Sequence, residues 1–306
     1  MALSAPFPYA GEAAAFASSL LWAGSGIVFR RMKGRVPPAG MNLAKNATAT
    51  VCFGLVLLLV TGAPWPVGLS GEAWLWLAVS GVVGLAVCDT FLLRAMMEIG
   101  PQRATLFMAL APVLVFLGAL LPPFSQTEAL SRATTWIGTA LALAGIVLAA
   151  SEAPVVGHDP RAYRAGVRDA LIASTLQAVG VLLARLGIEH GAGPLDASSI
   201  RLAAGVAGLL AGGLWFRRLR PWGRALATPG TLPVLVTAAF FGTFLGIGMN
   251  QAGLTWATST GAVSTINALA PVWLIPLTTV FLGEHHGGRA WLSTILALGG
   301  VALLAM

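Results

Sequence analysis

Charged side chains are scarce in this chain. Lys, Arg, Asp and Glu together make up 9% of its 306 residues, whereas they make up about a quarter of an ordinary soluble domain. Hydrophobic residues make up 57%, the mean hydropathy is +0.83, and no long polar stretch interrupts the sequence. These values exclude a soluble protein and a soluble domain on one anchor helix. They indicate a polytopic membrane protein that has the lipid bilayer as its partner.

Cysteine is nearly absent, and so are the common catalytic motifs. Cys52 and Cys88 lie inside apolar segments without CxxC spacing or a neighbouring histidine, so we expect no disulfide framework, no metal and no cofactor. The sequence has no phosphate-cradling glycine loop, nucleophile elbow or His-Glu zinc motif. This argues against an ATP-driven pump and against the commoner membrane hydrolases. We predict that the chain is not an enzyme.

The chain carries an excess of basic residues, with a formal net charge of +7. They lie at the ends of apolar runs without a basic stripe or an RNA-binding motif, so we expect no nucleic-acid partner. Apart from Lys45 and Arg201, which lie inside apolar segments, all but two of the basic residues fall on one side of the membrane. Arg132 and Arg185 fall on the other side. The positive-inside rule then places the basic loops in the cytoplasm and both termini outside the inner cell membrane.

Ten apolar segments are long enough to cross a bilayer, which takes about 20 residues. We place them at residues 10–30, 39–61, 72–97, 101–121, 132–150, 166–188, 195–216, 231–255, 260–282 and 289–306. The longest polar connection, from Ser151 to Arg168, falls midway. We therefore predict an all-α membrane protein with a first five-helix unit at 1–150, a linker at 151–165 and a second five-helix unit at 166–306.

The two halves resemble each other in sequence. The fourth and ninth segments share the motif ALAP, at 109–112 and 268–271. The fifth and tenth share identities at constant spacing, Trp136, Thr139, Leu141, Ala142, Leu143 and Gly145 against Trp291, Thr294, Leu296, Ala297, Leu298 and Gly300. In the earlier segments Lys45 aligns with Arg201. Because five is odd, the second copy must cross the membrane in the opposite sense, which predicts an inverted-topology repeat.

Ten segments in two halves, the two ALAP motifs and the ending FLGE at 281–284 resemble the EamA-type family of the drug/metabolite transporter superfamily. The resemblance covers nearly the whole chain. It implies transport of small metabolites without ATP hydrolysis, through a cavity lined by segments one to four and six to nine, often in exchange for protons or another solute. Residues 120–128, LLPPFSQTE, depart from the family's short turn. Members more often keep their termini in the cytoplasm, which is opposite to the charge distribution here.

Three ionisable residues lie inside apolar segments, where a charge needs a partner, water or a role. Lys45 and Arg201, at equivalent positions, are predicted to guard opposite mouths of the cavity and attract a carboxylate or phosphate. Alternatively, each snorkels or neutralises an acidic neighbour. Asp89 is predicted to pair with Lys45, or else to face the cavity and bind a proton or a cationic substrate.

Two prolines are predicted to break their helices. Pro271 has no amide hydrogen and frees the carbonyl of Asn267, whose side chain adds a donor and an acceptor. Pro112 repeats this arrangement without an asparagine. Both prolines are candidate hinges, and Asn267 is a candidate cavity residue. Trp273 lies two residues after Pro271 and is the tryptophan placed deepest.

The remaining cavity candidates are amides. Asn250 and Gln251 are adjacent, so they point to different sides and at most one of them faces the cavity. Gln177 is an isolated amide in the sixth segment, and hydrogen bonds between helices are the alternative use of such residues.

These features together predict a secondary transporter, an exporter of amino-acid-like or drug-like solutes by alternating access. Its partners would be a small-molecule substrate and protons as a coupling ion, in a monomer or homodimer. The alternative is a non-transporting membrane protein, such as a lipid-handling factor or a scaffold.

Overall fold

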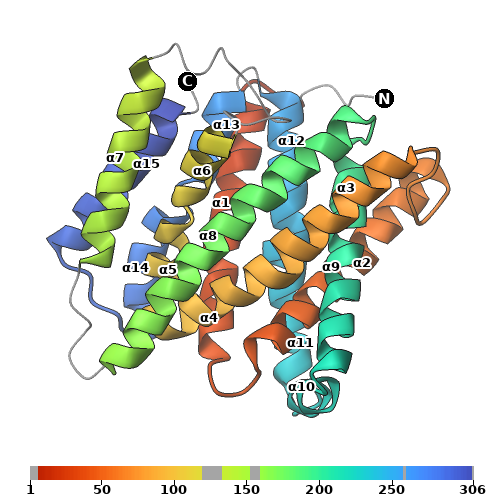
Figure 1. Cartoon of the computed structure of the whole chain (residues 1–306), viewed down its shortest axis with the longest axis horizontal. Helices are drawn as coiled ribbons and strands as arrows, with labels where there is room; N and C mark the ends of the chain where they lie inside the picture. The colour runs from red at the N-terminus through yellow and green to blue at the C-terminus, as the bar shows by residue number, and fades with distance from the viewer. Residues whose placement is uncertain (1–5, 119–132, 152–158, 258–259, 305–306) are drawn as a thin grey trace.

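The fold is described from a computed structural model, which describes residues 6–118, 133–151, 159–257 and 260–304. Every regular element in these ranges is helical (Figure 1). Residues 120–128, which depart from the family's short turn, lie outside the described ranges. The first half contains α1 (Ala10–Arg31), α2 (Pro38–Thr61), α3 (Gly71–Gly81), η1 (Val82–Cys88), α4 (Asp89–Ile99), α5 (Pro101–Phe107), α6 (Leu110–Gly118) and α7 (Ala133–Ala150).

The second half repeats this order with one added short helix. It contains α8 (Pro160–Glu189), α9 (Pro194–Trp215), α10 (Leu219–Leu226), α11 (Thr231–Ala239), η3 (Phe240–Leu245), α12 (Gly246–Trp256), α13 (Thr260–Asn267), α14 (Ala270–Leu282) and α15 (Gly288–Leu304). α10 is the additional element.

Nine helical stretches of the described residues are long and apolar enough to cross a membrane. They agree with the first nine predicted segments. The tenth predicted segment, 289–306, corresponds to the apolar helix Gly288–Leu304. This helix has 17 described residues, whereas a typical span has about 20. The ten-span count is therefore not confirmed by helix length.

α8 begins earlier than predicted, at Pro160 and not at residue 166. The side chain of Asp159 accepts a hydrogen bond from the backbone N–H of Arg161 at 2.9 Å, and Pro160 occupies the first helical turn. An aspartate cap followed by proline is a strong start signal for a helix. Part of the predicted linker is consequently helical.

Equivalent helices are interrupted in both halves. The third and eighth stretches each contain a π-helical segment, η1 and η3, that the apolar pattern did not predict. The fourth and ninth stretches break ahead of Pro112 and Pro271, because α5 ends at Phe107 and α13 ends at Asn267. The two breaks confirm the predicted effect of the prolines.

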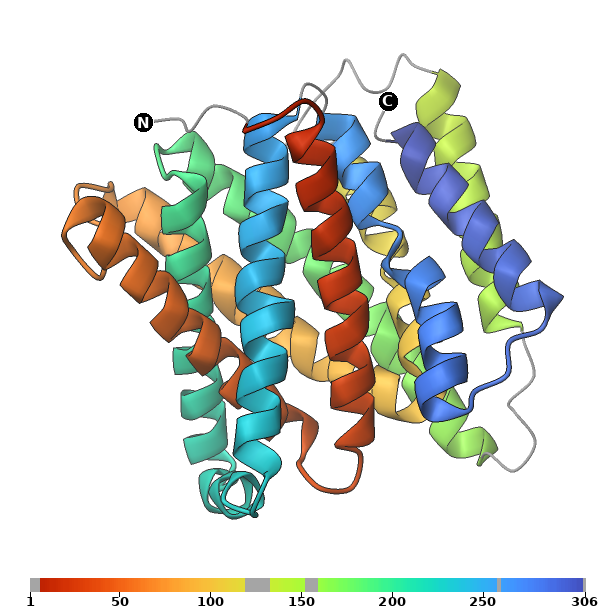
Figure 2. The same ribbon diagram turned by 180° about the vertical axis from the view of Figure 1, so that it is seen from behind.

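The helices form one bundle in which distant segments lie side by side (Figures 1 and 2). α1 begins and α15 ends at one end of the bundle, and α10 lies at the other. α7 packs along α15, and a Cβ at Gly300 would lie 2.3 Å from the backbone nitrogen of Ala142. Their close approach therefore depends on glycine.

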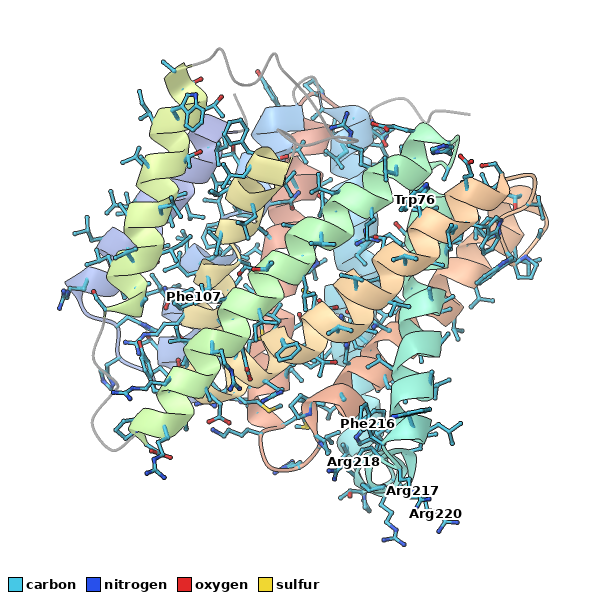
Figure 3. All side chains as sticks on the ribbon, viewed as in Figure 1. Trp76, Phe107, Phe216, Arg217, Arg218 and Arg220 are labelled. Atoms are coloured by element: carbon cyan, nitrogen blue, oxygen red, sulfur yellow. The ribbon has the colours of Figure 1, made fainter. Side chains whose placement is uncertain are left out.

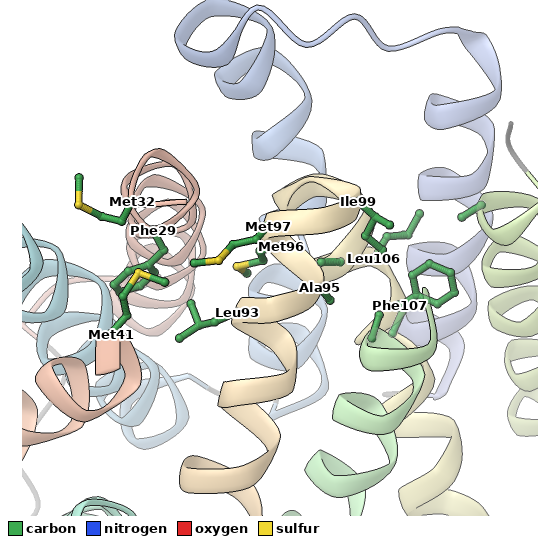
Figure 4. Close-up of a cluster of buried hydrophobic side chains, with 14 of the residues drawn as sticks. Phe29, Met32, Met41, Leu93, Ala95, Met96, Met97, Ile99, Leu106 and Phe107 are labelled. Carbon is green, nitrogen blue, oxygen red and sulfur yellow. The ribbon is translucent and has the colours of Figure 1, made fainter. Parts of the chain in front are cut away.

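The largest apolar cluster joins α1, α2, α4 and α5 toward the end of the bundle opposite the start of α1. Figure 4 shows Phe29, Met41, Leu93, Met96 and Phe107 from this cluster. All five are buried. This cluster packs the C-terminal parts of α1 and α4 against one another, and Asp89 begins α4 four residues before Leu93.

Candidate functional site

Lys45 and Asp89 form an ion pair in the interior of the bundle. Lys45 lies on α2, and Asp89 begins α4 directly after η1. The Nζ of Lys45 donates a hydrogen bond to Oδ2 of Asp89. Their side chains keep 11% and 16% of their exposure. The predicted pairing of these two residues is confirmed.

Arg201 on α9 reaches the same place. Its backbone crosses α3 at Gly81, where a Cβ would lie 2.2 Å from the Arg201 carbonyl oxygen. Its Nη2 would lie 3.3 Å from a Cβ at Gly84, in η1. Nε is buried and has no hydrogen-bond partner in the described part of the chain. Arg201 is nonetheless close enough to Asp89 and Cys88 to interact with both electrostatically.

The prediction that Lys45 and Arg201 stand at opposite mouths is wrong. Both side chains act on Cys88 and Asp89. The reason is that α2 and α9 pack directly against each other, so that equivalent positions of the two halves meet in the interior.

Two asparagines of α2 belong to this group, although sequence reasoning did not select them. Asn42 donates to the carbonyls of Leu85 and Ala86 at 2.8 and 3.0 Å, and Asn46 donates to the carbonyl of Leu85 at 3.1 Å. A π-helical turn leaves carbonyls without their usual helical partner. The signal was present in the sequence, because Asn42, Lys45 and Asn46 fall on one face of an apolar helix.

Gln177 of α8 lies against η1. The thiol of Cys88 donates to the carbonyl of Ala173 at 3.2 Å and contacts Oε1 of Gln177 at 3.6 Å. The amide of Gln177 thus takes part in a contact between helices, as in the alternative that the sequence left open. We refer to Lys45, Asp89 and Arg201 as the charged cluster, which Gln177 borders through its contact with Cys88.

A second group of polar side chains lies at the break ahead of Pro271. Nδ2 of Asn267 donates to Oδ1 of Asn250 on α12, whereas Oδ1 of Asn267 is buried without a hydrogen-bond partner among the described residues. Trp273 donates from Nε1 to Oγ of Ser19 on α1 at 3.1 Å. We call the pair Asn250 and Asn267 the break cluster; Trp273 follows the break, on α14.

The two neighbouring amides of α12 point to different partners, as predicted. Asn250 accepts from Asn267. Gln251 donates to Oγ of Ser198 at 3.1 Å and to the carbonyl of Pro194 at 3.3 Å, both on α9. Only Asn250 therefore belongs to the break cluster.

Ionic contacts tie three helices together where α1, α4 and α14 end. Lys33 donates to the carbonyl of Met97 at 2.6 Å and pairs with Glu98 at 3.1 Å. Nε of Arg30 lies 3.7 Å from Oε1 of Glu284. Glu284 is the last residue of the FLGE motif, and sequence reasoning used that motif only for the family resemblance.

A cavity of about 840 Å³ opens at the same end of the bundle. Arg217 and Arg218, just before α10, and Arg220, in α10, also lie at this end (Figure 3). The cavity is lined by residues of the α1–α2 loop, α4, α8 and α10, among them Lys33, Arg35, Arg94, Glu98, Asp169 and Pro221. None of the seven predicted cavity residues lines it. Arg94 is five residues after Asp89 in α4, so the cavity ends about 7.5 Å along the helix from the ion pair.

The sequence model of the EamA-like transporter family matches residues 9–151 and again residues 165–306. The chain belongs to the EamA-like transporter family. The double match assigns one copy of the family unit to each half, in agreement with the resemblance seen in the motifs.

Comparison with solved structures supports the fold of the EamA-like chain. A structure described as "Crystal structure of protein" superposes with a TM-score of 0.62 at 20% sequence identity, over 96% of this chain and 95% of the other. Such a low identity shows the fold alone. No curated protein matches the chain.

Proposed function

We propose that this EamA-like protein is a secondary transporter that exports a small organic solute, amino-acid-like or drug-like, across the inner cell membrane. The observation that carries the proposal is the charged cluster. Lys45, Asp89 and Arg201 all lie within stretches long and apolar enough to span a membrane. Ionisable groups at such depth are costly, and in membrane proteins they mark solute and ion pathways. They therefore favour transport over the alternative of a scaffold or a lipid-handling protein.

Alternating access is the proposed mechanism. The interruptions of the helices occur as pairs, η1 with η3 and the break before Pro112 with the break before Pro271. In an inverted repeat, two copies with matching flexible points can exchange conformations, and the cavity then opens to one side or the other. The ionic contacts of Lys33 with Glu98 and of Arg30 with Glu284 hold the ends of α1, α4 and α14 together beside the cavity.

Protons are the proposed coupling ion, and Asp89 is the proposed proton site. A carboxylate that is held by Lys45 and stays partly accessible could release Lys45 when it binds a proton. We expect an imposed pH gradient to accelerate solute exchange by the native protein and not by Asp89→Asn. Glu189→Gln, at the exposed end of α8, is the control and should respond as the native protein does. An equal response of Asp89→Asn would exclude Asp89 as the proton site.

The direct test of transport uses purified full-length protein in liposomes. The liposomes are loaded with a ¹⁴C-labelled extract of water-soluble cellular metabolites, and release of label is followed with and without protein. We expect protein-dependent release of a small set of compounds, which Asp89→Asn and Asn267→Ala reduce. If release does not exceed that from empty liposomes, the proposal of transport is wrong.

A further inference from the structure

Arg201 brings a positive charge into the bundle that no described side chain neutralises. Its Nε is buried without a hydrogen-bond partner, and Arg201 forms no ion pair with any residue of the described ranges. We infer that the transported compound carries an anionic group, a carboxylate or a phosphate, and that Arg201 binds this group. The inference rests on the proposed transport function and names the class of its substrate.

The balance of charge around Asp89 supports this inference. Asp89 is the carboxylate that interacts electrostatically with Arg201, but its ion pair is formed with Lys45 from α2. Asp169, on the neighbouring helix α8, is bound by Arg94 and Arg168 at 3.0 and 2.9 Å. Two cations thus face one carboxylate. Arg201 is partly buried, and a charge withdrawn from water without a full counterion is unfavourable, so an anion that enters the cluster would restore neutrality.

Two backbone carbonyls of η1, the element that Arg201 approaches at Gly84, are already engaged. The carbonyls of Leu85 and Ala86 in η1 accept hydrogen bonds from Asn42. The guanidinium of Arg201 faces Gly84, which has no side chain that could accept a hydrogen bond from it. The planar guanidinium matches the geometry of carboxylate and phosphate oxygens, to which it can donate two parallel hydrogen bonds.

The cavity that ends at Arg94, five residues along α4 from Asp89, also suits an anion. The cavity of about 840 Å³ is lined by three basic residues, Lys33, Arg35 and Arg94, and two acidic ones. The acidic ones, Glu98 and Asp169, are each paired with a basic residue. Arg35 has no ion-pair partner in the part of the chain that the structure describes. A net positive mouth raises the local concentration of anionic solutes.

The test identifies what the protein releases from the liposomes loaded with labelled metabolites. We expect mass spectrometry to show that every compound released by the native protein bears a carboxylate or a phosphate. Arg201→Gln should reduce this release at least about tenfold, whereas Arg201→Lys, which keeps the charge and loses the planar fork, should retain part of it. Arg185→Gln, in the pair with Glu189 on α8, should release the compounds at the native rate.

Thermal unfolding without substrate separates binding from a structural role. If Arg201 is uncompensated, Arg201→Gln has a melting temperature at or above that of the native protein, and a released compound raises Tm of the native protein and not of Arg201→Gln. A lower Tm of the substrate-free variant would overturn the inference, because Arg201 would then be satisfied within the protein.

The outcomes distinguish this inference from the proposed function. Release of neutral or cationic compounds only, or release that Arg201→Gln leaves unchanged, overturns the anionic substrate while transport stands. Release of no compound contradicts transport itself, and the inference falls with it.

Discussion

Asp89 interacts with two cations, Lys45 and Arg201, so single substitutions in this group should have unequal effects on stability. Removing one member of a buried ion pair leaves an uncompensated charge and costs about 3 kcal/mol or more. In Lys45→Ala, Asp89 still has Arg201 within electrostatic reach. In Asp89→Asn, both cations lose the one carboxylate that the described residues place beside them. We therefore expect Asp89→Asn to destabilise the protein more than Lys45→Ala.

The measurement is thermal unfolding of the purified variants in detergent, with Lys45→Met/Asp89→Asn as a third variant. The double variant should lie closer to the native protein than Asp89→Asn does, because it removes one of the two unpaired cations. Equal losses in both single variants would show that Arg201 does not interact with Asp89.

Helix η1 depends on side chains that belong to another element. The amide of Asn42 donates to two of its carbonyls. These carbonyls also accept from Asn46 and Thr90, so the loss of Asn42 removes hydrogen bonds worth about 0.5–1.5 kcal/mol each without leaving a carbonyl unsatisfied. We expect Asn42→Ala to lower the free energy of unfolding by an amount in this range and to disturb the position of Asp89, the next residue after η1.

Thr48→Ala on the same helix is the matched control. Its hydroxyl donates to the carbonyl of Ala44 in its own helix, so its loss leaves η1 intact. Thermal unfolding of both variants measures the effect on stability, and solute release measures the effect of a displaced Asp89 on transport. Native stability in Asn42→Ala would mean that η1 does not need the asparagine.

The contact between α7 and α15 allows a test with adjacent glycines. A Cβ at Gly300 would collide with Ala142, whereas a Cβ at Gly299 would meet no atom within 4 Å. Alanine favours a helix interior over glycine by about 1 kcal/mol. We therefore expect Gly299→Ala to raise Tm or leave it unchanged and Gly300→Ala to lower it. Thermal unfolding of both variants checks this, and equal effects would contradict the close packing.

Across the whole molecule, the ends of the bundle differ in charge. α10, with Arg220 and Arg224, and the α1–α2 loop, with Lys33 and Arg35, lie at the end opposite to the start of α1 and the end of α15 (Figure 2). The positive-inside rule places the arginine-rich end in the cytoplasm. We expect a reporter fused to the C-terminus that is active only in the cytoplasm to give no signal, and the same reporter in the α10 region to give a strong one. The reverse result would invert the predicted orientation.

The sequence by itself determined the membrane class, the boundaries of most helices, the two proline breaks and the family. Each depends on local composition or on short-range spacing, because bilayer thickness sets the length of an apolar run and a proline acts on the carbonyl four residues before it. Self-similarity between the halves also needs no structure. The Lys45–Asp89 pair was predicted because both residues lie at matching depths of neighbouring segments.

The tertiary structure alone decided which polar residues meet. Arg201 was expected at a separate mouth, yet the packing of α9 on α2 and on Gly81 brings it to Asp89. The π-helical segment η1 and the asparagines that satisfy it depend on contacts between helices, which no periodicity along one helix encodes. The break cluster likewise forms only where α12 and α13 approach. The unbalanced charge that points to an anionic substrate is therefore a property of helix packing, not of the sequence pattern.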